Sequence, residues 1–225
     1  AHPSARLLVQ RRARGLLLAP LAATTLGLGV VGDVWWGDSQ VEHVKGLQRA
    51  AIASFTHGDV LAQELEGREV IVLNSNSQAV GLYGEFVLAA YGQPVPASWR
   101  TLAMGEFAMF ASRPRDNVLE LAAIQGAWLR GPNELFFRRE DRHVVTGDVF
   151  EYPSLRVEVL ADEDGDPTKV RMTFPHSLED PRYLFLSSTP KGLRKWAVPA
   201  VGKPGVVPLP RMPVVEEGES RIDGD

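Results

Sequence analysis

The stretch Arg156–Phe174, RVEVLADEDGDPTKVRMTF, decides the fold of the C-terminal half of this chain. Apolar and polar residues alternate near both of its ends, which is the pattern of a strand with one buried face. The acidic segment Asp162–Pro167 lies between the two runs and supplies the Asp, Gly and Pro residues that favour a turn. We therefore predict a β-hairpin at this point.

Other short apolar runs surround this hairpin and predict further strands. The strand candidates are Phe107–Ala111, Val118–Ala123, Ala127–Arg130, Val149–Glu151, Leu155–Ala161, Lys169–Phe174, Tyr183–Ser187 and Leu193–Val198, with Leu135–Arg138 ambiguous. Short strands at this spacing predict an antiparallel β-sandwich or barrel-like domain over residues 104–210. The polar, acidic residues 211–225 are typical of a disordered tail.

Upstream, residues 39–103 predict a small α/β unit that packs on the β-domain. Val70–Leu73 is a continuous, mostly β-branched run, typical of a strand buried on both faces. Residues 78–91 have helical spacing and end before Gly92, and Trp99–Ala103 is the next strand candidate. The overall expectation is therefore an α+β fold.

Two more helices are expected before the first strand. Ser39 and Glu42 have the spacing of a capping box, and apolar residues recur at helical spacing after them. Asp59 is a suitable N-cap for a short second helix that ends at Leu65.

Residues 15–32, GLLLAPLAATTLGLGVVG, contain no charged side chain. Arg11, Arg12 and Arg14 precede this run, and Trp35 and Trp36 follow it. Eighteen helical residues cover roughly 27 Å, close to the ~30 Å hydrocarbon core of a bilayer. Residues 1–38 therefore predict a transmembrane helix, with the arginines on the cytoplasmic side and the tryptophans as interface anchors. A cleaved signal peptide, a buried core helix and a re-entrant or interfacial segment are the alternatives.

Composition narrows the function classes. The net charge is −4 and the sequence pI is about 5.8, so no nucleic-acid partner is expected. The chain contains no cysteine, which excludes disulfides, thiolate metal ligands and cysteine nucleophiles. This composition is compatible with a bacterial extracytoplasmic domain.

The best candidate for a ligand-binding site is the loop formed by Asn74, Ser75, Asn76 and Ser77. It follows a predicted buried strand and precedes a predicted helix, which is where open α/β sheets bind ligands. The loop lacks the glycines of a phosphate-binding loop, and a turn with Ser77 as a plain N-cap explains it equally.

Other motifs favour structural roles. The acidic run at 162–166 does not fit the spacing of a calcium loop and is expected to be a solvated turn. The five histidines are scattered, so we expect no metal site and no cofactor. Arg138 and Arg139 lie in a mixed charge run, for which a solvated face and anion binding are the two interpretations.

Several segments together resemble one type of bacterial protein. They are LAPL at 18–21, VIVLNS at 70–75, GQPVPASWRTLA at 92–103, GDVFEYPSLRVEVL at 147–160, GDPTKVRMTF at 165–174 and SLEDPRYLFL at 177–186. Residues 7–208 resemble the C-terminal ends of uncharacterised polytopic bacterial membrane proteins. The resemblance implies a last transmembrane helix followed by an extracytoplasmic module. The chain departs from that pattern at Asn76 and Ser77, where relatives tend to have Ala-Pro or Asp-Pro, and after Pro210.

The expected function is therefore a non-catalytic accessory or interaction domain of a larger integral membrane protein. The expected location is the extracytoplasmic side of the bacterial cytoplasmic (inner) membrane. The expected partners are the lipid bilayer and upstream transmembrane helices of the same protein, because the chain starts at Ala1 rather than Met. One alternative is the C-terminal part of a membrane-embedded transferase or hydrolase with upstream catalytic residues. Another is the extracytoplasmic cap of a transporter.

Overall fold

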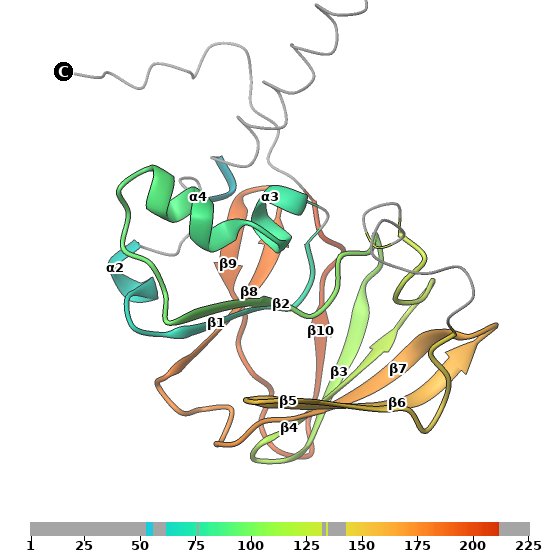
Figure 1. Ribbon diagram of the computed structural model, residues 1–225. Helices are drawn as coiled ribbons and strands as arrows, with labels where there is room; N and C mark the ends of the chain where they lie inside the picture. The colour runs from blue at the N-terminus through green and yellow to red at the C-terminus, as the bar shows by residue number, and fades with distance from the viewer. Residues whose placement is uncertain (1–52, 56–61, 76, 132–133, 135–142, 212–225) are drawn as a thin grey trace, which may run out of the picture. The chain divides into compact units, whose positions relative to one another are not determined.

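The computed structural model describes residues 53–55, 62–75, 77–131, 134 and 143–211 (Figure 1). All of them belong to one compact unit that spans Gln48–Asp225. The predicted membrane helix with its flanking arginines and tryptophans, the capping box and residues 212–225 lie outside the described part. Within the described residues, no helix is long and apolar enough to cross a bilayer.

A four-stranded sheet of order β2-β1-β8-β9 forms the centre of the fold. Its strands are β1 (Glu69–Val72), β2 (Ser98–Thr101), β8 (Tyr183–Thr189) and β9 (Gly192–Lys195). β1 pairs in parallel with both β2 and β8, and β9 is antiparallel to β8. The predicted buried strand at 70–73 is thus confirmed as a central strand with neighbours on both sides.

The placement of β8 and β9 differs from the sequence expectation, which put both segments in an antiparallel β-domain. They join the sheet of β1 instead. The physical reason is burial, because the first six residues of β8 are all buried, whereas one-sided strands alternate. Tyr183–Leu186 is the same kind of continuous apolar run as Val70–Leu73.

Three short helices cover one face of the four-stranded sheet: α2 (Ala62–Leu65), α3 (Gln78–Gly81) and α4 (Gly84–Ala90) (Figure 1). The core on this side consists of the buried residues Leu65, Val70, Val72, Val80, Leu88, Leu184, Leu186 and Leu193. The side chains of alternate residues in β1 therefore point toward the helices.

The prediction of a single helix over 78–91 was wrong, because the helix is interrupted between α3 and α4. Two side chains of β2 donate hydrogen bonds to carbonyls that would accept backbone hydrogen bonds in a continuous helix. Trp99 Nε1 donates to the carbonyl of Val80 (2.8 Å), and Thr101 Oγ1 donates to that of Gly81 (2.7 Å). Gly84 then passes so close to the Trp99 indole that any Cβ would collide with it.

The second sheet has six antiparallel strands in the order β10-β3-β4-β7-β6-β5. They are β3 (Met109–Arg115), β4 (Val118–Ala123), β5 (Val149–Tyr152), β6 (Leu155–Glu163), β7 (Asp166–Thr173) and β10 (Pro204–Val207). The predicted hairpin is confirmed as β6–β7. Its two turn residues, Asp164 and Gly165, both have positive φ (57° and 81°), as a type I′ turn requires.

In this region one local prediction was wrong and one strand was missed. Residues 127–130, predicted as a strand, form an irregular loop in which Leu129 has a positive φ of 68°. Strand β10 was not predicted, because its sequence PGVV carries no alternation and starts with a proline and a glycine. The coarse expectation of an α+β fold is confirmed, with two sheets and a small helical part.

The main core lies between the two sheets. The four-stranded sheet contributes Ile71, Leu73, Tyr183 and Phe185, and the six-stranded sheet contributes Met109, Leu119, Leu121 and Met172. The rings of Phe174 and Phe185 pack edge to face with centroids 5.9 Å apart. The four-stranded sheet is therefore buried on both faces, by helices on one side and by the second sheet on the other (Figure 1).

Arg113 of β3 is a fully buried arginine that connects three segments. Its guanidinium donates to the carboxylate of Glu179 (2.7 Å) and to the carbonyls of Asp116 (2.8 Å) and Pro199 (3.3 Å). The Arg113 side chain is 0% exposed, whereas that of Glu179 is 71% exposed. The ion pair therefore reaches from the interior to solvent, and it lowers the pKa of Glu179.

Candidate functional site

The six-stranded sheet is wider than the four-stranded sheet that covers its inner face. One row of paired residues on that face runs Leu119–Met172–Val157–Phe150, from β4 to β5. Leu119 is 0% exposed and Met172 3%, whereas Val157 and Phe150 are only partly buried. The side chains of this apolar row therefore become more exposed from β4 to β5. Part of the inner face of β5 and β6 thus extends beyond the main core.

This overhang forms one wall of an open cavity of about 850 Å³. We call this cavity the overhang groove. It is lined by Arg100, Thr101, Leu102, Trp128, Leu129, Val144, Phe150, Tyr152, Pro153, Leu155, Val157, Val159, Pro167, Val170 and Met172. Mostly apolar lining and a volume of several hundred Å³ are typical of small-molecule sites.

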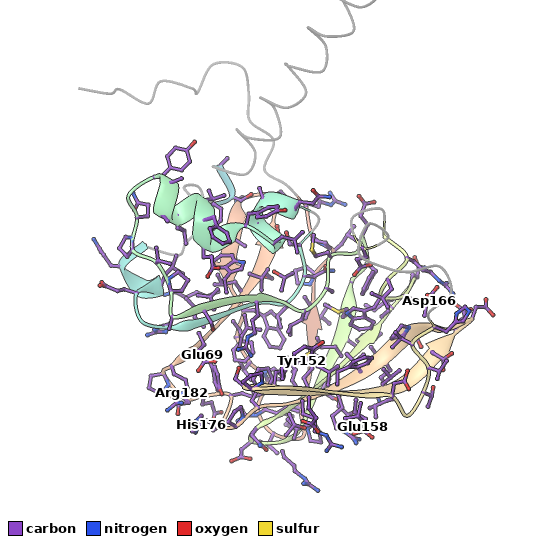
Figure 2. All side chains as sticks on the ribbon, in the orientation of Figure 1. Glu69, Tyr152, Glu158, Asp166, His176 and Arg182 are labelled. Atoms are coloured by element: carbon purple, nitrogen blue, oxygen red, sulfur yellow. The ribbon has the colours of Figure 1, made fainter. Side chains whose placement is uncertain are left out.

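The groove lies between two edge strands, β2 of the four-stranded sheet and β5 of the six-stranded sheet. Figure 2 shows Tyr152 between β5 and the four-stranded sheet, and Glu158 on the other side of the six-stranded sheet. Glu158 belongs to an ion-pair network with Arg171 and Glu120 on that outer face. The same sheet therefore has one charged face and one apolar face, and the groove lies on the apolar one.

Arg100 is the charged residue of the groove lining. Its neighbours in β2, Trp99 and Thr101, point to the helices, because both donate hydrogen bonds to carbonyls of α3. Side chains alternate along a strand, so Arg100 points to the opposite face. It pairs in register with Ile71, which packs in the main core. Arg100 therefore lies on the edge strand of the four-stranded sheet, on the same face as the core residue Ile71, and lines the groove.

The guanidinium of Arg100 makes no hydrogen bond or ion pair with any other residue in the described ranges. Arg68, Arg115 and Arg211 likewise have no carboxylate partner in the described part of the chain, whereas five other arginines do. Arg113, Arg130, Arg156, Arg171 and Arg182 each pair with a carboxylate at 2.7–3.2 Å. A partly buried guanidinium beside an apolar wall is therefore available to an anion.

The loop that contains Trp128 and Leu129 forms another part of the groove lining. Trp128 is anchored by its Nε1, which donates to the carbonyl of Leu102 (3.1 Å), and by its ring, which packs on Phe107. The backbone N–H of Trp128 donates to the carbonyl of Pro167 at 2.9 Å, which ties the loop to β7. The indole N–H is thus already satisfied within the protein.

Glu134 holds the same loop in place from behind. Its buried carboxylate accepts hydrogen bonds from the backbone N–H groups of Leu129 (2.9 Å), Gly131 (3.2 Å) and Met104 (3.2 Å). Burial raises the pKa of Glu134, although these three hydrogen bonds act in the opposite direction. The interactions explain how Leu129 is kept in a conformation that non-glycine residues rarely adopt.

The predicted loop site lies at the carboxyl end of β1 and is mostly buried. Asn74 and Ser75 are 1% and 0% exposed, and Ser77 is 7% exposed. Ser77 caps α3 by accepting from the N–H of Val80 (3.4 Å), and Ser75 Oγ accepts from the N–H of Ser77 (3.2 Å). Asn76 lies outside the described residues.

Only one of the two polar atoms of the Asn74 side-chain amide has a hydrogen-bond partner in the described part of the chain. The Nδ2 of Asn74 donates to the carbonyl of Phe107 at 2.6 Å. None of the described loop residues, Asn74, Ser75 and Ser77, lines the overhang groove. The described loop residues therefore serve mainly to close the end of β1 against neighbouring segments.

The acidic turn uses its carboxylates locally. Asp162 accepts from the hydroxyl and the N–H of Thr146 (2.6 and 2.8 Å), and these bonds lower its pKa. Glu163 and Asp166 pair with Arg130 at 3.0 and 2.7 Å. Across the described ranges, no group of three or more His, Asp or Glu side chains is arranged to hold a metal ion. Arg138 and Arg139 lie outside those ranges.

Sequence reasoning missed the groove residues. The alternation in Arg156–Phe174 predicted the hairpin, in which Val157 and Met172 pair on one face of the sheet. It could not show that the covering sheet ends at β2, because that depends on the pairing of β1 with segments distant in sequence. A signal for Arg100 was its place in a short strand whose neighbours Trp99 and Thr101 face the helices.

Comparison with protein-family models, with curated proteins and with solved structures finds no match to this chain.

Proposed function

We propose that the described unit is a non-catalytic accessory domain of a larger integral membrane protein, and that it acts by binding an apolar ligand in the overhang groove. The observation that carries this proposal is the groove itself. Its wall continues the hydrophobic core past the edge of the covering sheet. Apolar surface that the described residues do not cover favours association with another apolar body.

The accompanying proposal concerns location. Residues 15–32 span the cytoplasmic membrane as the last helix of a polytopic protein, and the domain lies on the extracytoplasmic side. The exposed aromatic residues Tyr83, Phe86 and Tyr91, which are 52%, 62% and 48% exposed around α4, support a place near a membrane surface. Aromatic side chains are favoured in the interfacial region of a bilayer.

Photolabelling of the whole 225-residue chain in lipid nanodiscs tests the binding function. The probe is a neutral long-chain alcohol that carries a diazirine on its chain, and the adducts are mapped by peptide mass spectrometry. We expect adducts on groove residues such as Phe150, Val157 and Met172. Val157→Lys places a charge on the groove wall and should abolish these adducts.

Val206→Lys is the matched control, because Val206 is an exposed valine on β10 at the other edge of the same sheet. It should leave groove labelling unchanged. Equal labelling in both variants, or adducts spread evenly over the surface, would overturn the binding function. Recovery of the intact chain from cells in the soluble fraction without detergent would overturn the membrane location.

A further inference from the structure

The overhang groove also identifies the chemical class of its ligand. We infer that it binds a narrow, long-chain amphiphile with an anionic head group, such as a long-chain carboxylate, and that Arg100 holds the head group. This inference rests on the binding function proposed above and adds the identity of the ligand to it.

The groove wall is apolar along the length of β6. Leu155, Val157 and Val159 lie on one face of β6 and are flanked by Val170 and Met172 of β7. At about 3.3 Å per residue, the β6 row extends over roughly 13 Å. A ligand that covers this wall is therefore elongated and apolar along its body.

Few polar side-chain atoms of the lining are available to a ligand. Trp128 Nε1 donates to the carbonyl of Leu102, and Thr101 Oγ1 points to the helix side of β2, where it donates to the carbonyl of Gly81. Among the described lining side chains, this leaves the Tyr152 hydroxyl and the Arg100 guanidinium without a partner. A ligand with hydrogen-bonding groups along its body would leave those groups unpaired on the apolar wall, at a cost in affinity. This favours a ligand whose polar atoms are confined to one end.

The positive charge of Arg100 favours an anionic head group. Arg100 lies in the groove lining on an edge strand, and its guanidinium has no partner in the described part of the chain. A guanidinium forms bidentate, charge-assisted hydrogen bonds with carboxylates, and these are stronger than neutral ones. Arg100 is therefore suited to bind the charged end of the ligand, while the apolar tail lies on β5, β6 and β7.

The volume argues for a small ligand rather than a second protein chain. A cavity of about 850 Å³ is within the range of sites that take up a drug-sized molecule. The edge strand β5 has only four residues, which offers a short template for pairing with a strand of another chain.

The test uses competition for the photolabelled groove in the same nanodiscs. Palmitate and hexadecanol, which differ in head group, compete with the diazirine-bearing alcohol for labelling of Phe150, Val157 and Met172. We expect palmitate to compete on the order of tenfold or more better than hexadecanol. Arg100→Met should remove this preference without changing competition by hexadecanol, and Arg100→Lys should retain part of it.

Arg115→Met is the control, because Arg115 is an exposed arginine of β3 outside the groove lining. If palmitate and hexadecanol compete equally in the unchanged chain, the head-group inference is wrong although the binding function stands. If the groove is not labelled at all, the binding function is wrong as well. A native mass spectrum in which Val157→Lys converts a dimer to a monomer would show that a second copy covers the groove, and would overturn the inference.

Discussion

Replacing Arg113 by methionine tests whether the buried arginine stabilises the packing of three distant segments. The substitution keeps most of the side-chain volume but removes the donors to the carbonyls of Asp116 and Pro199 and to the Glu179 carboxylate. Glu179 is 71% exposed, so solvent screens its charge and its share of the ion pair contributes little to stability.

The two carbonyls contribute more. Hydrogen bonds from a charged donor contribute about 1.5–3 kcal/mol each, and the bond to Pro199, at 3.3 Å, is the weaker of the two. Part of this total is regained, because methionine is less costly to bury than a guanidinium. We expect a net loss of about 3 kcal/mol in the free energy of unfolding.

Urea unfolding of the chain followed by tryptophan fluorescence measures this loss. With a slope near 2 kcal/mol per molar, the midpoint should fall by about 1.5 M. The exposed Arg115 of the same strand provides the control, since Arg115→Met should change stability by less than about 0.5 kcal/mol. If Arg113→Met unfolds within 0.3 M of the unchanged chain, the argument that these bonds stabilise the fold is refuted.

Two other substitutions test the loop beside the groove and the outer ion-pair network. Glu134→Ala leaves three backbone N–H groups without their acceptor, so we expect a loss of about 2–4 kcal/mol in urea unfolding, with a smaller loss for Glu134→Gln; an unchanged midpoint would contradict this role. Burial raises the pKa of Glu120, but hydrogen bonds from Arg171 and Lys169 outweigh it and lower the pKa below 4.5. A carboxylate with a lowered folded-state pKa stabilises the fold above its unfolded value and loses that contribution as the pH falls through the lowered pKa. Thermal unfolding should therefore shift down below about pH 4.5, and less so in Glu120→Gln; parallel pH profiles for the two chains would refute this assignment.

The features that could be predicted from the sequence are those that depend on residues close together along the chain. The β6–β7 hairpin follows from alternation around Asp164 and Gly165, because turn chemistry acts within a few residues. The buried strand at Val70–Leu73 follows from its uninterrupted apolar run. Its position in the centre of a sheet with β8 does not, since that pairing joins residues far apart along the chain.

The candidate site could not be predicted for the same reason. The loop after β1 was favoured by a positional rule for open α/β sheets, but in the described structure Asn74 and Ser75 are buried and donate hydrogen bonds to the carbonyls of Phe107 and Ala103. The groove exists because one sheet is wider than the other, which is a property of the assembled pair. The importance of Arg100 becomes apparent only once its neighbours are known to face the helices.

The parallel pairing of β1 with β8 has a consequence for how the protein is made. Glu69 of β1 pairs with Tyr183 of β8, so the central strand must wait for a segment that leaves the ribosome much later. Pairings between such distant segments close large loops and form slowly. A chain that ended before β8 would leave the apolar strand β1 with an unpaired edge, which is a template for aggregation. Nascent chains of this protein should therefore depend on chaperones until β8 has been translated.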